Sequence, residues 1–376
     1  MTAAPADWAI ELRHVAKTYR GRVQALQGIA LHVRRGEVFG LLGPNGAGKS
    51  TLVKILMTVV RPTRAEGTLL GRPIGHKPTL AKVGYLPENH RFPRYLTGRQ
   101  TLDFFAALAK TDRPTRRRRA EQLLETVGMT AWADARVSTY SKGMMQRIGL
   151  AQSLVHDPDL VLLDEPTDGV DPVGRRDILD VLGRLREQGK TVFVNSHALS
   201  ELETICDRVA ILVKGQVVRQ GTMDELTIAK QRYEIEVVAA DPARTREQVK
   251  AAVPAAWAPS PSPAPTPPPL ASSGPPPLPY AAPPLPTFSA SRFIDRGRLP
   301  SGQAIEMEGP VLRVETTDPA DVQGVIDSLR HAALVIRRVQ PVRPSLEELF
   351  LEAVTDPTTG LRATPGAERG RRGERP

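Results

Sequence analysis

The chain has 376 residues, enough for two or three domains, and its 51 basic and 41 acidic side chains give a net charge of +10. No apolar run approaches the ~20 residues that a membrane-spanning helix needs, so we expect a soluble or peripheral protein. The single cysteine, Cys206, excludes an internal disulfide and suits a reducing compartment. The basic runs contain no aromatic residue, which disfavours a stacking surface for single-stranded nucleic acid. We expect these charges on solvated helix faces and a basic tail, with contact to lipid headgroups as the alternative.

Residues 7–228 are predicted to form an α/β domain, because short apolar strands alternate there with helical patterns. The strand candidates share a short apolar run and span 10–15, 38–42, 82–86, 160–163, 191–195 and 209–213. Helices are predicted at 52–60 and 142–155. This alternation favours a parallel sheet, whose ligands bind beyond the carboxyl ends of the strands.

The segment from Gly43 to Ser50 follows the strand at 38–42 and fits the pattern G-x-x-x-x-G-K-[ST] at every fixed position. Glycines let backbone N–H groups turn inward and cradle phosphate oxygens at a helix N-terminus, where the dipole favours negative charge. Lys49 is expected to reach the β- and γ-phosphates of a nucleotide, and Ser50 to hold Mg²⁺ with its hydroxyl. The predicted nucleotide contacts are Gly43, Pro44, Asn45, Gly46, Ala47, Gly48, Lys49, Ser50 and Thr51.

A serine and a glycine stand at the start of the helix predicted over 142–155. Ser141 is placed to cap this helix, and Gly143 lies in its first turn. A helix N-terminus with a serine hydroxyl and a glycine is suited to binding an anion. We therefore predict that Ser141 and Gly143 contact phosphate.

Two acidic residues follow the apolar strand at 160–163. Asp164 and Glu165 lie at its carboxyl end, where open α/β sheets bind their ligands. Asp164 suits Mg²⁺, held through water, and Glu165 suits a general base that orients an attacking water. An ordinary strand-ending turn is the alternative, which the preceding phosphate loop disfavours.

Residues 229–253 and 303–355 are predicted to form a small C-terminal α+β domain, with strands near 233–238, 311–315 and 333–339 and helices near 245–253 and 318–330. A last helix is predicted at 345–354, where Ser345 and Glu348 have the spacing of a capping box. Residues 254–291 separate the two halves and carry no charge, and 15 of the chain's 35 prolines lie between Pro254 and Pro286. We predict a linker or surface insertion there, and a disordered basic tail at 356–376.

The order of the phosphate loop, the serine–glycine segment and the Asp-Glu strand resembles that of the ATP-binding cassette (ABC) family, over residues 8 to about 228. The family signature L-S-G-G-Q is altered here, with Tyr140, Lys142 and Met144 at its first, third and fifth positions. Ser141 and Gly143 are kept, and in that family they meet the γ-phosphate. The resemblance implies a P-loop NTPase fold, with an ABC-type nucleotide-binding domain, a helical signature subdomain and ATP as the nucleotide.

Four further positions take their expected roles from the resemblance alone. Tyr19 stands where relatives stack an aromatic ring on adenine, and Asp171 where a loop connects opposed sites across a dimer. His197 resembles the histidine that touches the γ-phosphate, its alternative being a purely structural histidine. Glu88 replaces the glutamine of a loop that contacts the metal, and its carboxylate can still ligate Mg²⁺.

The segments 85–88 and 140–144 are most similar to the branch whose ATPases pair with separate export permeases for drugs, lipids, polysaccharides or ions. The resemblance thus implies an ATP-hydrolysing exporter subunit at the cytoplasmic face of the membrane. Its expected partners are a second copy or a related ABC subunit, and an integral membrane permease encoded by another chain. No nucleic acid is expected as a partner.

The alternative function is that of a soluble ABC-type ATPase acting on DNA or the ribosome. Only 90 residues separate Ser50 from Ser141, without sustained heptads, which disfavours the long coiled coil of the DNA-repair ATPases. Ribosome-associated relatives usually carry two cassettes, and this chain has one. A non-hydrolysing regulator is a third possibility, which the presence of Glu165 disfavours.

Overall fold

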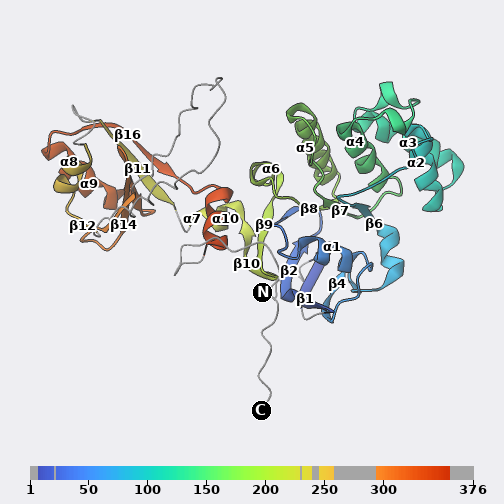
Figure 1. Ribbon diagram of the computed structural model, residues 1–376, viewed down its shortest axis with the longest axis horizontal. Coiled ribbons are helices and arrows are strands. Elements are labelled where there is room, and N and C mark those ends of the chain that lie inside the picture. The colour runs from blue at the N-terminus through green and yellow to red at the C-terminus, as the bar shows by residue number, and fades with distance from the viewer. Residues whose placement is uncertain (1–6, 21–22, 229–230, 239–244, 258–293, 356–376) are drawn as a thin grey trace, which may run out of the picture. The chain divides into compact units, whose positions relative to one another are not determined.

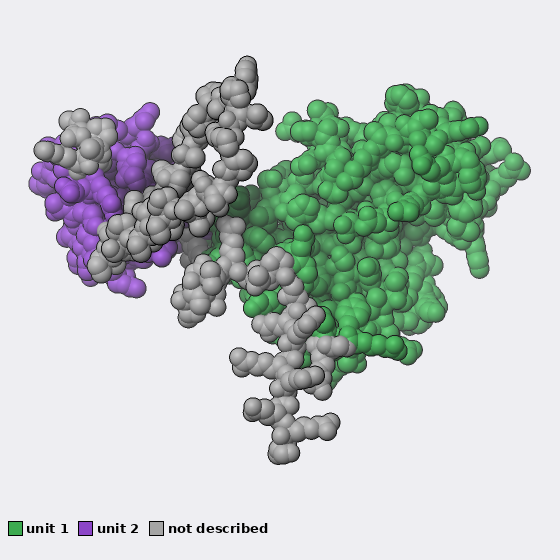
Figure 2. All heavy atoms as spheres, in the orientation of Figure 1, with its two compact units in different colours: residues 1–227, 345–376 green, residues 228–344 purple. Residues whose placement is uncertain are grey.

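The computed structural model describes residues 7–20, 23–228, 231–238, 245–257 and 294–355. Its contacts divide the chain into two compact units, residues 1–227 with 345–376 and residues 228–344 (Figure 2). We call the first unit the cassette and the second the inserted unit. The basic tail predicted at 356–376 lies outside the described residues, as does the predicted insertion at 254–291 apart from residues 254–257.

The centre of the cassette is a six-stranded sheet whose inner strands are parallel (Figure 1). Its order is β10-β9-β3-β8-β7-β6, and only β10 runs antiparallel to its neighbour. Every residue of β3, β7 and β8 is buried, as expected for continuous apolar strands in a sheet covered on both faces. The bounds are β3 Val38–Leu42, β6 Val83–Leu86, β7 Leu160–Asp164, β8 Thr191–Asn195, β9 Arg208–Val213 and β10 Gln216–Thr222.

A second, antiparallel sheet of the cassette has the order β2-β1-β4-β5. Its strands are β1 Trp8–Tyr19, β2 Val23–Arg34, β4 Arg64–Leu69 and β5 Arg72–Pro73. Apolar side chains of β1 and β2 form one core with α1 (Lys49–Leu56) and with one face of the central sheet. Phe39 and Phe193 stack in this core, with ring centroids 5.7 Å apart. Ala25 of β2 lies directly against Gly48, so this layer supports the phosphate loop.

The remaining helices of the cassette cover the central sheet and form the predicted helical subdomain (Figure 1). In the subdomain, Thr97 and Gln100 form a capping box at the start of α2, and Asp112 and Ser141 cap α3 and α4. The α-helices are α2 Gly98–Leu108, α3 Arg113–Thr126, α4 Lys142–Ser153, α5 Pro172–Glu187, α6 Leu199–Ile205, α7 Met223–Ile228 and α10 Leu346–Val354. Three 3₁₀ turns are η1 Lys77–Lys82, η2 Thr130–Trp132 and η3 Val137–Thr139.

The inserted unit has one antiparallel sheet of order β12-β13-β14-β15-β11-β16 and two helices. Its elements are β11 Arg232–Val238, α8 Thr245–Ala252, β12 Ala256–Trp257, β13 Ile294–Arg298, β14 Ala304–Glu308, β15 Val311–Glu315, α9 Pro319–His331 and β16 Val335–Val342. The four strands β16-β11-β15-β14, with α8 and α9 as connections, have the split βαβ topology of ferredoxin-like folds.

The strands of the inserted unit alternate between a buried and a charged face. Ile235 and Leu312 are fully buried in a core that α9 covers with Leu329. On the opposite face Arg313 bonds Glu234 at 2.9 Å, one of several cross-strand ion pairs, which also include Arg313–Glu308, Arg296–Glu306 and Arg337–Glu236. One packed face and one solvated face explain the period of two in these strands.

The structure differs from the sequence prediction at the C-terminal boundary. The sequence places 345–354 in the small domain, whereas α10 belongs to the cassette. Its apolar residues Leu346, Leu349 and Val354 are buried in the larger core of the cassette, together with Leu202 and Ile205 of α6. The small fold also includes β13, which begins at residue 294, ahead of the predicted start at 303, and β12, which lies within the predicted insertion.

Candidate nucleotide site

A cavity of about 400 Å³ lies beyond the carboxyl ends of β3, β7 and β8. The parallel register pairs Asp164 at the end of β7 with Asn195 at the end of β8, and Leu41 of β3 also aligns with Asn195. The cavity is lined by Leu42, Gly43, Pro44, Asn45, Lys49, Ser50, Glu88, Asp164, Glu165, Asp168, Asn195, His197, Leu199 and Phe350. Three strand ends therefore bring together residues far apart in the sequence.

The phosphate loop has a backbone path that only glycine can follow at two points. Gly48 has a φ of +111°, and a Cβ there would lie 2.5 Å from the carbonyl oxygen of Ala25. A Cβ at Gly43 would lie 2.3 Å from the carbonyl oxygen of Leu212. Gly46 also has positive φ, and the N–H of the buried Ala47 donates to Pro44. Larger side chains would therefore displace the loop from the strands that support it.

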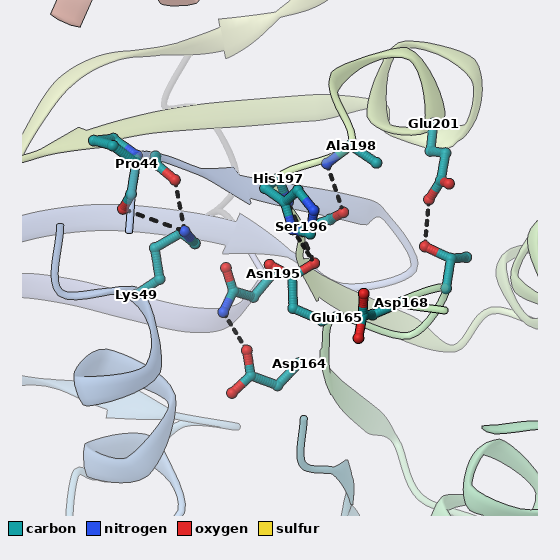
Figure 3. Close-up of polar contacts among 12 residues, drawn as sticks. Pro44, Lys49, Asp164, Glu165, Asp168, Asn195, Ser196, His197, Ala198 and Glu201 are labelled. Carbon is teal, nitrogen blue, oxygen red and sulfur yellow. Dashed lines mark hydrogen bonds and ion pairs between the residues drawn. The ribbon is translucent and has the colours of Figure 1, made fainter. Parts of the chain in front are cut away.

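Lys49 holds its ammonium inside this loop. Its side chain is only 7% exposed, and Nζ donates to the carbonyl oxygen of Gly43 at 2.6 Å (Figure 3). Burial lowers the pKa of Lys49, and the nearby carboxylates of Glu165 and Asp164 oppose that change. The ammonium of Lys49 is thus poorly solvated, and the neighbouring carboxylates help to keep it charged. A charged lysine at this position can neutralise a phosphate.

Asp164 is 3% exposed and accepts a hydrogen bond from Nδ2 of Asn195. Burial raises the pKa of Asp164, and the negative charges of Glu88 and Glu165 raise it further. The Lys49 ammonium opposes these effects, but its influence is the smallest of them. The oxygen of the same side-chain amide, Oδ1 of Asn195, is buried and has no hydrogen-bond partner. Buried carboxylate and amide oxygens are the donors that a hard divalent ion prefers, so the residues fit Mg²⁺.

Glu165 and His197 form a direct pair at the mouth of the cavity (Figure 3). Oε2 of Glu165 lies 2.8 Å from Nδ1 of His197. Glu165 has a φ of +53°, and its N–H donates to the carbonyl oxygen of Asn195 at 2.8 Å, so the backbone turns the carboxylate into the cavity. The imidazole is 63% exposed and therefore open to a ligand.

Sequence reasoning missed two residues that support this pair. Asn195 orders both acids, since its amide bonds Asp164 and its carbonyl bonds Glu165. Nε2 of Gln146, in α4, donates to the carbonyl oxygen of Glu165 at 2.9 Å. Asn195 could have been recognised from the sequence, because it is a polar residue at the end of a buried strand. Nothing in the sequence around Gln146 marks it as a residue of the site.

The predicted signature residues Ser141 and Gly143 do not line their own subunit's cavity; Ser141 is exposed and Gly143 is half-buried. Ser141 caps α4 by accepting from the N–H of Met144 at 3.3 Å, which confirms the predicted cap. A Cβ at Gly143 would lie 3.6 Å from the side chain of Val170, an ordinary van der Waals contact. Lys142 forms an ion pair with Asp168 at 2.7 Å, which links the start of α4 to the loop after Glu165.

Two further predicted residues also lie outside the cavity lining. Tyr19 is 39% exposed, and its hydroxyl lies 3.5 Å from Oγ1 of Thr51 in α1, next to the phosphate loop. Asp171 caps α5 by accepting from the N–H groups of Val173 and Gly174. The structure thus gives Asp171 a local capping contact and leaves its expected dimer role untested.

Outside this cavity, the described residues offer neither a second ion site nor a membrane-spanning helix. There, no group of three or more His, Cys, Asp or Glu side chains is arranged to hold a metal. Within the same residues, no helix combines the length and apolar character needed to cross a bilayer.

The parallel sheet, the glycine-constrained loop and the acidic strand end define a P-loop ATPase. A family model described as ABC transporter matches residues 26–168. The daunorubicin resistance ATP-binding protein DrrA3 of Streptomyces coeruleorubidus is 31% identical over 93% of this chain and 97% of its own length. The chain therefore belongs to the ABC transporter ATP-binding proteins, and it is the ATP-hydrolysing subunit of an ABC exporter.

Other relatives match mainly the cassette. An ABC transporter ATP-binding protein of Synechocystis sp. is 43% identical over 60% of this chain and 66% of its own length. The fluoroquinolones export ATP-binding protein of Mycobacterium tuberculosis is 40% identical over 57% of this chain and 70% of its own length. Among solved structures, the dimeric cassette MJ0796 bound to ADP and Pi matches with a TM-score of 0.53 and 25% identity, over 57% of this chain and 98% of its own.

Proposed function

We propose that this chain drives the export of drug-like molecules through a separate membrane permease, at the cytoplasmic face of the membrane. Two similar proteins are named for daunorubicin resistance and for fluoroquinolones export, and the first aligns over nearly the whole chain. The solved relative that is a dimer supports a cassette pair as the working form. Closure of that pair on ATP and its opening after hydrolysis would move the permease between two states.

The Glu165–His197 pair beside Lys49 is the observation that carries the catalytic assignment. Glu165 acts as the general base that orients and deprotonates the attacking water. His197, held at 2.8 Å from that carboxylate, contacts the γ-phosphate through its exposed ring. Lys49 neutralises charge on the β- and γ-phosphates from inside the loop.

Mg²⁺ is part of the proposal, and the donor set is Ser50, Asp164 and Glu88. All three line the cavity, and the unpartnered Oδ1 of Asn195 supplies one more oxygen acceptor. The ion would compensate charge on the phosphates. Glu88 is exposed, so it can approach the metal without the cost of burying another carboxylate.

The arrangement also supports composite sites formed by two copies of the cassette. Ser141 is exposed, Gly143 is half-buried, and both are absent from the lining of their own subunit's cavity. A helix start with these residues is available to meet the γ-phosphate of ATP bound to a partner. Tyr19 lies beside Thr51, where it can stack on the base, and Asp171 would connect the opposed sites.

The test is Glu165→Gln, which keeps the shape of the side chain and removes its charge. We expect ATP to bind and turnover to fall by ~10²–10⁴, the usual contribution of a general base. The variant should accumulate as an ATP-bound dimer on size-exclusion chromatography, whereas wild type should not. Wild-type turnover in Glu165→Gln would refute the assigned base.

A further inference from the structure

Helix α10 is the last described helix of the chain, and it belongs to the cassette. Ser345 starts it by accepting a hydrogen bond from the N–H of Glu348 at 3.2 Å. Its buried face joins the core that contains α6, and Arg219 of β10 forms an ion pair with Glu352 at 3.4 Å. The chain therefore leaves the cassette, builds the inserted unit and returns to complete the cassette.

Helix α6 is the element on which α10 packs. It has only seven residues, follows directly after His197, and has no side-chain cap at its N-terminus. A helix this short is unstable alone, so its position is set by what packs against it. One such contact is a hydrogen bond from the N–H of Leu346, at the start of α10, to the carboxylate of Glu203.

Helix α6 also contacts the loop that follows Glu165. The hydroxyl of Thr167 donates to Glu201 of α6 at 2.5 Å (Figure 3). Arg175 of α5 lies 3.5 Å from the same carboxylate. Helix α6 is therefore held between α10 and the loop of the catalytic acids. Any displacement of α10 would be transmitted to His197 through this short helix.

Phe350 brings α10 to the nucleotide cavity itself. Its ring, half-buried, lines the cavity beside Leu199, the first residue of α6, and His197. Both Phe350 and Leu199 pack against the same apolar cluster of the cassette. The side of the cavity behind His197 is thus built by a residue more than 150 positions away in the sequence.

We propose that α10 is a working part of the ATPase site, and that Phe350 is a positioning residue that holds α6 and His197 against the γ-phosphate position. This inference rests on the proposed role of His197. The phosphate loop lies on other elements, β3 and α1, so α10 acts on turnover and leaves nucleotide affinity unchanged.

The experiment compares Phe350→Ala with wild type in the full chain, by steady-state ATP hydrolysis. A misplacement of about 1 Å can reduce a rate ~10²-fold, so we expect kcat to fall by roughly 10- to 100-fold. The KM for ATP should stay within about twofold, because affinity is set mainly by the phosphate loop. Phe350→Leu should recover most of the rate. Glu347→Ala, on the exposed face of α10, is the matched control and should behave as wild type.

Epistasis shows whether Phe350 acts through His197. If it does, His197→Ala with Phe350→Ala will be no slower than His197→Ala alone, whereas independent effects multiply. Multiplying effects, or wild-type kcat in Phe350→Ala, would overturn the proposal. A wild-type rate in His197→Ala would instead reject the proposed role of His197, so the two failures are distinguishable.

A second variant covers the case in which Phe350→Ala does not fold. Glu203→Gln weakens the bond between α6 and α10 without opening a cavity. We expect a smaller fall in kcat, about two- to tenfold, at unchanged KM and absent in a His197→Ala background. Unchanged kcat in a folded Glu203→Gln variant would contradict the positioning role of α10.

Discussion

Asp164 of the cassette and Asp295 of the inserted unit are equally inaccessible, each with 3% of its surface exposed. Their surroundings differ. Asp295 bonds Arg246 at 2.6 Å and Lys250 at 3.0 Å, so two cations compensate its charge. Asp164 has a neutral amide as its hydrogen-bond partner. Burial and the negative neighbours Glu88 and Glu165 raise its pKa, and the Lys49 ammonium lowers it by less.

Asp295 therefore has the surroundings of a structural acid, and Asp164 those of a functional one. A buried carboxylate that is fully paired contributes to folding and needs no ligand. A buried carboxylate left with an elevated pKa stores an unfavourable interaction that a bound cation relieves, and this is typical of sites that do chemistry.

The largest effect is expected for Asp164→Asn. Turnover should fall by ~10²–10⁴ because the carboxylate proposed to hold Mg²⁺ is lost. The folded apo protein should be as stable as wild type or more stable, since a repelled charge has been removed. Hydrolysis assays and urea unfolding measure the two effects. A strongly destabilised Asp164→Asn would show that this acid is structural after all.

The stability difference between wild type and Asp164→Asn should depend on pH. The pKa of Asp164 is raised in the folded protein, so the folded state binds the proton more tightly than the unfolded state. The stability contributed by this group is therefore greatest below the unfolded pKa and is lost as pH rises through the folded pKa. The stability gained by Asp164→Asn should accordingly be larger at pH 7 than near pH 3.5.

Exposed polar residues offer the next contrast between the units. Ser141→Arg should leave ATP binding by one subunit nearly intact and abolish ATP-dependent dimerisation and turnover, because a bulky cation would fill the space of the partner's γ-phosphate. Arg296→Ala, which breaks an exposed ion pair of the inserted unit, should change neither. Mixing Ser141→Arg with Lys49→Ala subunits can assemble at most one intact composite site. Full activity of Ser141→Arg alone would exclude the composite site.

A moderate effect on stability is expected for Asp295→Ala. It leaves Arg246 and Lys250 without this partner, but both are partly exposed, so the loss should be about 1–3 kcal/mol and confined to the inserted unit. The KM for ATP should not change. The measurement is unfolding followed by the fluorescence of Trp257, which lies in that unit, in a background where Trp8 and Trp132 of the cassette are replaced by Phe. No change in stability would mean that the ion pairs contribute nothing net.

The smallest effect is expected from deleting residues 259–290, which include most of the uncharged proline-rich stretch. Loop-closure entropy changes slowly with length, so folding and ATP hydrolysis should remain close to wild type. The deletion must spare Trp257, because β12 pairs with β13. Loss of nucleotide-dependent dimerisation would contradict this expectation, whereas reduced export with intact hydrolysis would indicate that the segment binds a partner.

Sequence reasoning succeeded where a motif and its element are contiguous. The phosphate loop and the Asp164-Glu165 strand end were predicted because a fully apolar strand precedes each, and the caps Ser141 and Ser345 because capping is local. The long strand β2 was missed although the buried Ile29, Leu31 and Val33 alternate there with less buried residues.

Contacts between distant segments could not be predicted. The capping box pattern of 345–354 gives a helix but not the surface on which the helix packs, and an amphipathic face is compatible with either unit. The bond from Gln146 to Glu165 likewise depends on how α4 lies against β7. These are the parts of the site that tertiary packing decides.

The return of the chain through α10 also has a consequence for the order of synthesis. The phosphate loop, both acids and His197 are made before residue 228, but Phe350 follows only after the whole inserted unit has been translated. At the usual ~5–20 residues per second, that interval lasts roughly 6 to 25 s. If α10 acts as proposed, a nascent cassette that already binds ATP would therefore hydrolyse it slowly until α10 emerges.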